Sequence, residues 1–442
     1  MNNFYNLGLS EELVRAVESK GYSSPSPIQE QAIPAILEGR DILAAAQTGT
    51  GKTAGFTLPI IQRLSSTVDV AHKRRPVKAL ILTPTRELAA QIQDNVAQYA
   101  SNTDLSSEVV FGGVKINPQI ARLKGGVDIL VATPGRLLDL CSQKACRLDQ
   151  LDVLVLDEAD RMLDMGFIHD IKKLMKLVPK KRQTLLFSAT FSKEIKVLTN
   201  DFLKDPVKIE ITPENTTAET VKQTAYRCDQ SEKPKAVVKL IQDHQMEQVL
   251  IFTRTKHGAN RLAKKLEDNG IVAKAIHGNK SQGARTKALD GFKDKTVKAL
   301  VATDIAARGI DIAYLPFVIN YELPNVAEDY VHRIGRTGRA GRSGEAVSLV
   351  CNEERPFLKG IEKLTSLQIP LLDIEGFEPQ DWPDRAPTAS EVLKANARRK
   401  EAARQARPPR KRPQGGGKKK AANQGSGGGG GGRGSRRPRR RD

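Results

Sequence analysis

The residues best suited to chemistry lie in one stretch, residues 41–53, with the sequence DILAAAQTGTGKT. A short apolar run leads into a glycine-bearing turn and then into a helix-compatible segment, which is the layout of a phosphate-binding loop. Gly49 and Gly51 lack a Cβ, so the backbone can turn tightly and bring its N–H groups up to phosphate oxygens. Lys52 adds positive charge at the start of the helix, and the Thr53 hydroxyl can ligate Mg²⁺. The predicted nucleotide contacts here are Ala46, Gln47, Thr48, Gly49, Thr50, Gly51, Lys52 and Thr53.

A second candidate group is the run of carboxylates in VLVLDEAD, residues 153–160. It ends an apolar strand, and the carboxyl ends of parallel strands face the ligand crevice of an α/β sheet. Asp157 is suited to hold Mg²⁺, and Glu158 to orient or deprotonate an attacking water. Taken alone, this run could be an acidic helix start and the glycine turn an ordinary turn. Their occurrence together favours a nucleotide-hydrolysing site.

Basic and hydroxyl residues in the second half of the chain could complete such a site. HRIGRTGR, residues 332–339, places arginines between glycines, and these read as arginine fingers supplied to a γ-phosphate, with a solvated basic loop as the alternative. SAT, residues 188–190, ends a strand and is a weak signal alone, while TDIAARGID, residues 303–311, closes the same strand-end surface. Five further loops combine small or hydroxyl residues with Arg, Lys or free backbone N–H groups, the chemistry of phosphate contacts: PTREL, FGG, TPGR, TRTKHG and HGNKSQGAR.

These motifs need strands and helices to position them. Continuous apolar runs separated by amphipathic helices predict a parallel sheet covered on both faces. The alternation stops at a polar break and then restarts, so we expect an α/β fold with two tandem domains, of which only the first carries a GKT loop. The predicted strands are 78–83, 109–111, 128–132, 153–156, 184–187 and 207–211 in the first domain, and 221–228, 248–253, 272–276, 297–302, 317–321 and 345–350 in the second. The predicted domains are 1–211 and 220–375, joined by a linker at 212–219 and followed by a disordered tail, 376–442.

Charge and composition separate the folded part from this tail. Residues 381–442 hold 19 Lys and Arg against 5 Asp and Glu, a net charge of +14, whereas the other 380 residues carry 52 against 46, or +6. Within this tail, residues 411–441 contain no aromatic residue, so they can attract a polyanion through its phosphates but offer no platform for base stacking. Four scattered cysteines suit a reducing compartment, and no targeting segment or membrane span is predicted. We therefore expect a soluble, cytoplasmic protein that contacts no membrane.

In order along the chain, GYSSPSPIQ, AQTGTGKT, PTREL, GG, TPGR, DEAD, SAT, IFTRTK, QGAR, ATDIAARGID and HRIGRTGR resemble the complete motif series of the DEAD-box RNA helicases. The resemblance covers residues 4 to about 351, and FGGVKINPQ, RMLDMGFIHDI and IHGNKSQGARTKA are further similar to the bacterial RhlE-type branch. It implies two RecA-like domains, ATP and Mg²⁺ as cofactors, and RNA gripped by its backbone. Ser26 stands where Thr is usual, and Ala46 is normal for the family although the general phosphate-loop pattern has Gly there.

The resemblance also implies roles for single residues. Gln29 would read the adenine edge, Tyr22 would stack on the ring and Phe4 would support the pocket, with a buried amide capping its own helix as the alternative for Gln29. Lys52, Thr53, Asp157 and Glu158 would act as above, and Ser188 and Thr190 would couple hydrolysis to strand separation. Asp311 would touch the ribose, Gly309 would be a further nucleotide-binding residue, and Arg336 and Arg339 would be the fingers. The RNA path would be lined by Arg86, Gly113, Thr133, Arg136, Arg254, Arg285 and Thr303.

The implied activity is RNA-dependent ATP hydrolysis coupled to local, non-processive unwinding of RNA duplexes or remodelling of RNA–protein complexes, by a monomeric core. Ribosome assembly and RNA turnover both fit the family, with ribosomal precursors or RNA-decay proteins as partners. Two alternatives stay open. A DNA-directed helicase would share the phosphate loop and fingers, and an RNA annealer or scaffold would work through the basic tail.

Overall fold

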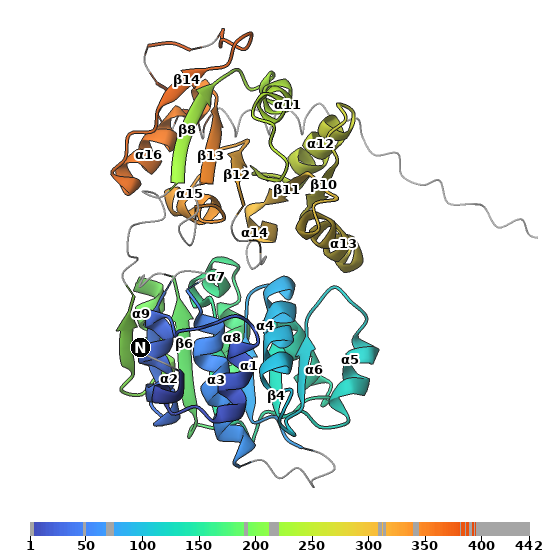
Figure 1. Ribbon diagram of the computed structural model, residues 1–442, viewed down its shortest axis with the longest axis vertical. Coiled ribbons are helices and arrows are strands. Elements are labelled where there is room, and N and C mark those ends of the chain that lie inside the picture. Colours follow the sequence, from blue (N-terminus) through green and yellow to red (C-terminus); the bar gives the residue numbers. More distant parts are fainter. Residues whose placement is uncertain are drawn as a thin grey trace, which may run out of the picture. The chain divides into compact units, whose positions relative to one another are not determined.

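The computed structural model describes residues 4–46, 50–67, 75–189, 193–211, 221–307, 312, 315–338, 344–380, 382–384, 386–388, 391, 392 and 394. Within this part, two seven-stranded parallel sheets are each covered by helices (Figure 1). The first sheet has the strand order β3 (Ser107–Val110), β4 (Ile129–Ala132), β2 (Ala79–Leu82), β5 (Val153–Leu156), β6 (Gln183–Ser188), β1 (Ile42–Ala45) and β7 (Val207–Glu210). Its helices are η1 (Phe4–Leu7), α1 (Glu11–Glu18), α2 (Pro27–Leu37), α3 (Lys52–Ser65), α4 (Arg86–Tyr99), α5 (Ile116–Leu123), α6 (Pro134–Ser142), α7 (Ala159–Asp164), α8 (Ile168–Met175) and α9 (Lys193–Phe202).

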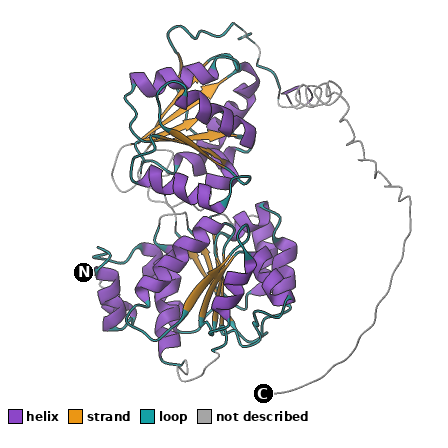
Figure 2. Ribbon diagram, turned by 90° about the vertical axis from the view of Figure 1, so that its right-hand side faces the viewer, coloured by secondary structure: helices purple, strands orange, loops and turns teal. Residues whose placement is uncertain are grey.

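The apolar runs form strands because both faces of the sheet are buried. Successive residues of β2 show this: Ala79 and Ile81 belong to one hydrophobic cluster, while Leu80 and Leu82 belong to another on the opposite face. Figure 2 shows the strands of each sheet lying between layers of helices. A strand covered on both sides gains from apolar residues at every position, which is why these strands read as continuous runs in the sequence.

The second sheet repeats the strand order of the first. Its order is β10 (Ala273–Ile276), β11 (Ala299–Thr303), β9 (Val249–Thr253), β12 (Phe317–Asn320), β13 (Gly344–Val350), β8 (Val221–Arg227) and β14 (Leu371–Asp373). Numbered within its own sheet, each strand has a counterpart in the other, so that β8 corresponds to β1, β9 to β2 and β13 to β6. The helices are α11 (Lys233–Asp243), α12 (Lys256–Glu267), α13 (Gln282–Lys293), α14 (Asp304–Ala307), α15 (Ala327–Ile334), η2 (Asn352–Glu354) and α16 (Arg355–Thr365).

The predicted strands are confirmed to within a few residues at their ends, and the prediction of two parallel α/β sheets is confirmed. The sequence prediction missed β14, which pairs with β8 at the sheet edge and has three exposed residues, so it lacks the apolar run of a buried strand. Contacts with the second sheet continue beyond residue 375. The Arg355 guanidinium lies 4.9 Å from the centroid of the Trp382 ring and donates hydrogen bonds to the carbonyls of Pro383 and Asp384.

Residues Met1–Ala389 form one compact unit, and the chain from Ser390 is a separate unit. The predicted linker at 212–219 and nearly all of the predicted tail lie outside the described residues. Within the described part, all four cysteines are free thiols, and no helix is long and apolar enough to cross a lipid bilayer.

Candidate active site

The phosphate-binding turn is held in place by the helix that precedes it. Gly51 caps α3 with a φ of 90°, a left-handed conformation that favours glycine, and a Cβ at this position would lie 2.5 Å from Nε2 of Gln29. Gln29 Nε2 donates to the Gly51 carbonyl at 3.0 Å, and Ser26 Oγ donates to the Thr50 carbonyl at 2.8 Å. The turn and α2 are therefore fastened together by side-chain amide and hydroxyl groups.

The three residues predicted for an adenine pocket have different surroundings. Gln29 is buried and accepts a hydrogen bond from the Ser26 N–H at 2.9 Å, so it caps its own helix while its amide nitrogen holds Gly51. Phe4 is buried in the hydrophobic core of the first sheet. Tyr22 is 46% exposed, which leaves its ring accessible for stacking. Both the capping alternative and a position beside the phosphate turn are thus realised for Gln29.

Lys52 and Asp157 place opposite charges at the carboxyl edge of the first sheet. Lys52 opens α3, is buried, and donates from Nζ to the Ala46 carbonyl at 2.7 Å. Asp157 follows β5 and is also buried, with Oδ1 accepting the Glu158 N–H at 3.0 Å. Burial raises the pKa of Asp157 to about 6, the carboxylates of Glu158 and Asp160 add to this, and Lys52 opposes it. A ligand that brings a cation to the Asp157 carboxylate and an anion to the Lys52 ammonium would therefore neutralise both buried charges.

Glu158 is the most constrained residue of this edge. Its φ of 52° and ψ of 51° are left-handed values that are rare for a residue with a side chain and cost free energy. The side chain is 6% exposed, and Oε2 is buried without a hydrogen-bond partner in the described structure. A buried carboxylate oxygen without a partner is costly unless a ligand or water completes it.

The next carboxylate joins the acidic loop to the strand end at Ser188. Asp160 Oδ2 accepts the Ala189 N–H at 3.1 Å, and Oδ1 accepts the Arg161 N–H at 3.0 Å. The Ser188 carbonyl in turn accepts the Ala46 N–H at 3.0 Å. A movement of Ser188 and Ala189 would therefore alter one hydrogen bond to Ala46, before the phosphate turn, and one to Asp160 in the acidic loop.

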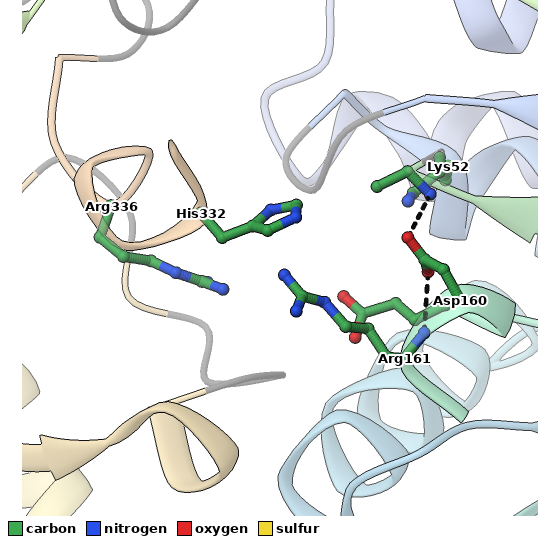
Figure 3. A pocket seen from close by; sticks show the side chains of 7 residues that line it. Lys52, Asp160, Arg161, His332 and Arg336 are labelled. Atoms are coloured by element: carbon green, nitrogen blue, oxygen red, sulfur yellow. Dashed lines mark hydrogen bonds between the residues drawn. The ribbon is translucent and has the colours of Figure 1, made fainter. Parts of the chain in front are cut away.

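Residues from the second sheet line the same small pocket. The side chains of His332 and Arg336 point toward Arg161 and the acidic loop (Figure 3). The pocket is lined by Lys52, Glu158, Asp160, Arg161, Ala189, His332 and Arg336. Arg161 Nη1 lies 3.3 Å from Oδ1 of Asp329 on α15. The HRIGRTGR segment thus reaches the phosphate loop and the carboxylates.

Arg333, in the same segment, has a different environment from Arg336. It is 2% exposed and forms a bidentate pair with Asp304, with one bond of 2.8 Å from Nη2, and donates to the Asn320 amide and the Glu322 carbonyl. Asp304 of the TDIAARGID stretch is therefore committed to holding Arg333. Arg333 therefore has a structural role in the interior of the second domain.

A second cavity of about 430 Å³ collects several of the residues predicted for an RNA path. Arg86, Thr133, Arg136 and Arg285 line it, and Gly112 from the FGG turn does so as well. Gly113 has a φ of 79°, and a Cβ there would overlap the guanidinium of Arg86. Arg136 Nη1 and Arg285 Nε are buried without hydrogen-bond partners in the described residues. Both arginines line the cavity, and guanidinium groups that are incompletely paired among the described residues fit an anionic ligand.

Glu87 connects the two sheets beside this cavity. Its Oε2 lies 2.7 Å from Arg285 Nη2, with both side chains less than a tenth exposed, and its Oε1 accepts the Gln282 amide at 2.9 Å. Burial lowers the pKa of Arg285, and Glu87 opposes that effect. The motif QGAR thus holds PTREL directly.

Arg254 and Thr303 were predicted for the same path but lie at the ends of β9 and β11. Arg254 Nη2 donates to Glu354 at 3.1 Å and Nη1 to Asn325 at 3.4 Å. Glu354 is fully buried and forms an ion pair with the fully buried Lys233. Thr303 is half-buried and stands beside Thr253 in the sheet register.

Seven predicted site residues lie outside the described part of the chain: Gln47, Thr48, Gly49, Thr190, Gly309, Asp311 and Arg339. Sequence reasoning had also missed several residues that the structure brings to the site. Asp160 and Arg161 stand in and next to the DEAD stretch, so their position was a usable signal. Glu87, Asp329, Lys233 and Glu354 gave none, because their partners come from distant parts of the chain.

Known proteins share both halves of this arrangement. The family model described as DEAD/DEAH box helicase matches residues 26–198, and that of the helicase conserved C-terminal domain matches residues 232–341. The chain is 41% identical over 391 residues to an ATP-dependent RNA helicase, CshA, of Limosilactobacillus reuteri, covering 88% of this chain and 75% of that protein. It is 43% identical over 374 residues to the RNA helicase CrhR of Synechocystis sp., covering 84% and 75%. The solved structure of S. cerevisiae Dbp5 bound to RNA and ADP BeF3 superposes with a TM-score of 0.74 at 32% identity, covering 86% of this chain and 96% of that one.

Proposed function

This chain belongs to the DEAD-box ATP-dependent RNA helicases, and we propose that RNA stimulates ATP hydrolysis at its Lys52–Glu158 site and that the cycle opens short RNA duplexes locally. The proposal also includes remodelling of RNA–protein complexes, without processive movement. The observation that carries it is the buried, partnerless oxygen of Glu158, set beside Asp157 in a pocket that His332 and Arg336 also line.

The residues of this pocket divide the work of hydrolysis. Lys52 and the N–H groups of the phosphate turn bind the phosphates, and Glu158 orients or deprotonates the attacking water. Arg336 and Arg339 stabilise the charge that develops on the transferred phosphoryl group. Glu158 is suited to its role because its buried Oε2, which has no partner among the described residues, can accept a hydrogen bond from a water in the site.

The donor set also fits Mg²⁺ that arrives with the nucleotide. Mg²⁺ is usually held by one or two carboxylates together with substrate phosphates and waters. Asp157 and the Thr53 hydroxyl would hold it, and the pair of buried carboxylates, one with an unpartnered oxygen, supplies the negative charge. When bound, the ion neutralises phosphate charge.

The nucleoside half of ATP would lie against the first domain. Gln29 reads the adenine edge, the exposed Tyr22 ring stacks on the base, and Phe4 supports the pocket from the core. Gly309 and Asp311 are proposed at the ribose. Because Gln29 also holds the Gly51 carbonyl, adenine recognition would be relayed to the phosphate turn through a single side chain.

RNA is proposed to run through the larger cavity, held by its backbone. Arg86, Gly113, Thr133, Arg136, Arg254, Arg285 and Thr303 would line this path. The unpaired N–H groups of Arg136 and Arg285 support phosphate binding there. Among the described residues that line the cavity, Phe167 is the one aromatic residue, so little sequence preference is expected.

RNA and ATP are coupled because each site uses both sheets. The Glu87–Arg285 and Arg161–Asp329 pairs join the sheets beside the two sites. A ligand that binds this joined form better than the separated one shifts the population toward it and thereby assists the other ligand. Ser188 and Thr190 would transmit hydrolysis to the RNA, and the Asp160–Ala189 bond is the described part of that route.

The test is steady-state ATP hydrolysis by the full chain with no nucleic acid, with single-stranded RNA, and with DNA of the same sequence. Strong stimulation by RNA alone, lost in Glu158→Gln, is the expected result. Equal stimulation by DNA would favour the DNA-directed alternative, since contacts to 2′-hydroxyls are what distinguish RNA. RNA binding without any stimulation would overturn the proposal.

The basic tail supports a second candidate activity, RNA annealing. A net charge of +14 over residues 381–442 attracts phosphates in a salt-dependent way and can bring two strands together. Because Trp382 to Asp384 contact Arg355, the informative truncation removes only residues 390–442. We expect weaker RNA binding at moderate salt and unchanged ATP hydrolysis at saturating RNA. Loss of hydrolysis at saturating RNA would contradict this division of labour.

The biological setting is proposed from the family. A monomeric core acting in the cytoplasm on ribosomal precursors or in RNA turnover, within the RhlE-type branch, is consistent with the motif series and with the four free thiols. Profiling of RNA crosslinked to the Glu158→Gln protein would identify the RNA class, and failure to recover ribosomal or decaying transcripts would rule out this setting.

A further inference from the structure

One wall of the larger cavity carries exposed apolar side chains that the hydrolytic and phosphate-binding roles leave unexplained. Ile305, at the start of α14, is 57% exposed and lines this cavity. Met165 and Phe167, both half-buried, line it from the first sheet's side. A large apolar side chain exposed in a cavity loses free energy to water unless a ligand covers it.

The remaining lining of the cavity is polar and cationic. Arg86, Arg136 and Arg285 contribute guanidinium groups, and Nη1 of Arg136 and Nε of Arg285 have no hydrogen-bond partner among the described residues. A ligand that satisfies both kinds of lining needs anionic groups on one side and an apolar face on the other. A strand of RNA has this character, because its phosphates alternate with ribose rings that present C–H groups.

We propose that Met165, Phe167 and Ile305 form an apolar wall that packs against the ribose of one nucleotide while the arginines bind its flanking phosphates. This inference rests on the proposed RNA site and adds a contact to it. A ribose is preferred over a base as the occupant because the lining has no amide or carboxylate side chain placed as a base reader, apart from Glu87 and Asp139, which are paired. Glu87 binds Arg285 and Gln282, and Asp139 lies 3.9 Å from Arg136 and accepts a hydrogen bond from Gln143.

The wall is also physically joined to the hydrolytic carboxylate. Met165 caps the C-terminus of α7, and Glu158 caps its N-terminus. Six residues of helix span about 9 Å, so a nucleotide pressing on Met165 acts on the same rigid element that holds Glu158. RNA contact at the wall and water positioning at Glu158 therefore share one short helix.

The test compares Ile305→Ser with Val272→Ser in the full chain. Val272 is a matched control because it is 51% exposed in the same domain and does not line the cavity. The readout is the RNA concentration that half-maximally stimulates ATP hydrolysis, measured with uridine oligomers and with abasic oligomers that keep ribose and phosphate. Loss of about one to two methylenes of contact predicts an increase of roughly four- to fifteenfold for Ile305→Ser with both RNAs, and no change for Val272→Ser.

Two results would overturn the inference: an equal response of the two serine variants, or an Ile305→Ser defect confined to base-bearing RNA. Arg136→Gln separates this failure from failure of the proposed RNA site. If Arg136→Gln weakens RNA stimulation while Ile305→Ser matches its control, only the apolar wall is wrong. If Arg136→Gln has no effect either, the cavity is not the RNA site.

Discussion

Two lysines occupy equivalent places in the two sheets and have opposite surroundings. Lys52 is the first residue of the helix that follows β1, and Lys233 is the first residue of the helix that follows β8, the counterpart of β1 in the second sheet. Within the part of the chain that the structure describes, Lys52 Nζ donates to one backbone carbonyl, that of Ala46. Lys233 Nζ donates to the carbonyls of Tyr321 and Leu349 and forms an ion pair with Glu354.

The difference supports the proposal that the phosphates of ATP bind at the first sheet, beside Lys52. All three donors of the Lys233 ammonium are used inside the protein, and although burial lowers the pKa of Lys233, Glu354 and Cys351 raise it above its usual value overall. The lysine is therefore charged and fully compensated. Among the described residues, Lys52 Nζ has a single acceptor, which leaves two of its donors for a ligand, and Oε2 of the neighbouring Glu158 has no partner.

The largest expected effect comes from removing the partner of the compensated lysine. Glu354→Gln leaves Lys233 as a buried charge without a counter-ion, which typically costs about 3–5 kcal/mol of unfolding free energy. Urea denaturation measures this cost. The double variant Lys233→Met/Glu354→Met should recover much of it, because it removes both charges together, and an equal loss in the double variant would show that the pair is not the cause.

A smaller effect is expected at two equivalent glycines. Gly113 follows β3, and Gly278 follows the corresponding strand β10. Gly113→Ala should cost about 1–2 kcal/mol, because its φ is left-handed and a Cβ overlaps Arg86. At Gly278 a Cβ meets nothing within 4 Å, so Gly278→Ala should be neutral or slightly stabilising. Equal melting temperatures for the two variants would contradict the assigned backbone geometry.

The smallest effect concerns the pH dependence of stability at Asp157. Its folded-state pKa of about 6 lies above the usual 3.8, so the folded state binds the proton more tightly. The stability from this group is fully present below the unfolded pKa and is lost as the pH rises through about 6. Without nucleotide, wild type should therefore lose about 1 kcal/mol relative to Asp157→Asn between pH 5 and pH 7. Parallel urea curves for the two proteins would show instead that Asp157 does not titrate there.

The sequence predicted the fold well because parallel strands buried on both faces leave continuous apolar runs. Residues 153–156 were placed as a strand to the residue, whereas β14 was missed because Leu371 and Leu372 are exposed at an edge. The same logic singled out Asp157 and Glu158, which follow β5 directly, and Lys52, which opens the helix after β1.

Long-range pairing could not be predicted in this way. Nothing near Glu87 indicates that it binds Arg285, 198 positions along the chain, because the pair forms only when the first turns of α4 and α13 meet. Lys233 lies in no recognised motif, and its equivalence to Lys52 follows only from the shared strand order of the two sheets. Arg333 stands among the proposed fingers, and its burial against Asp304 depends on packing that spacing does not encode.

The most direct test of this account is steady-state ATP hydrolysis at saturating RNA by Lys52→Met and Lys233→Met, each assayed at a temperature where both are folded by circular dichroism. We predict that Lys52→Met lowers turnover by at least about a hundredfold, since it removes a cation from the phosphates. Lys233→Met should melt at a lower temperature but keep most of its turnover. Loss of turnover in folded Lys233→Met, or near-normal turnover in Lys52→Met, would contradict the assignment of one lysine to chemistry and the other to structure.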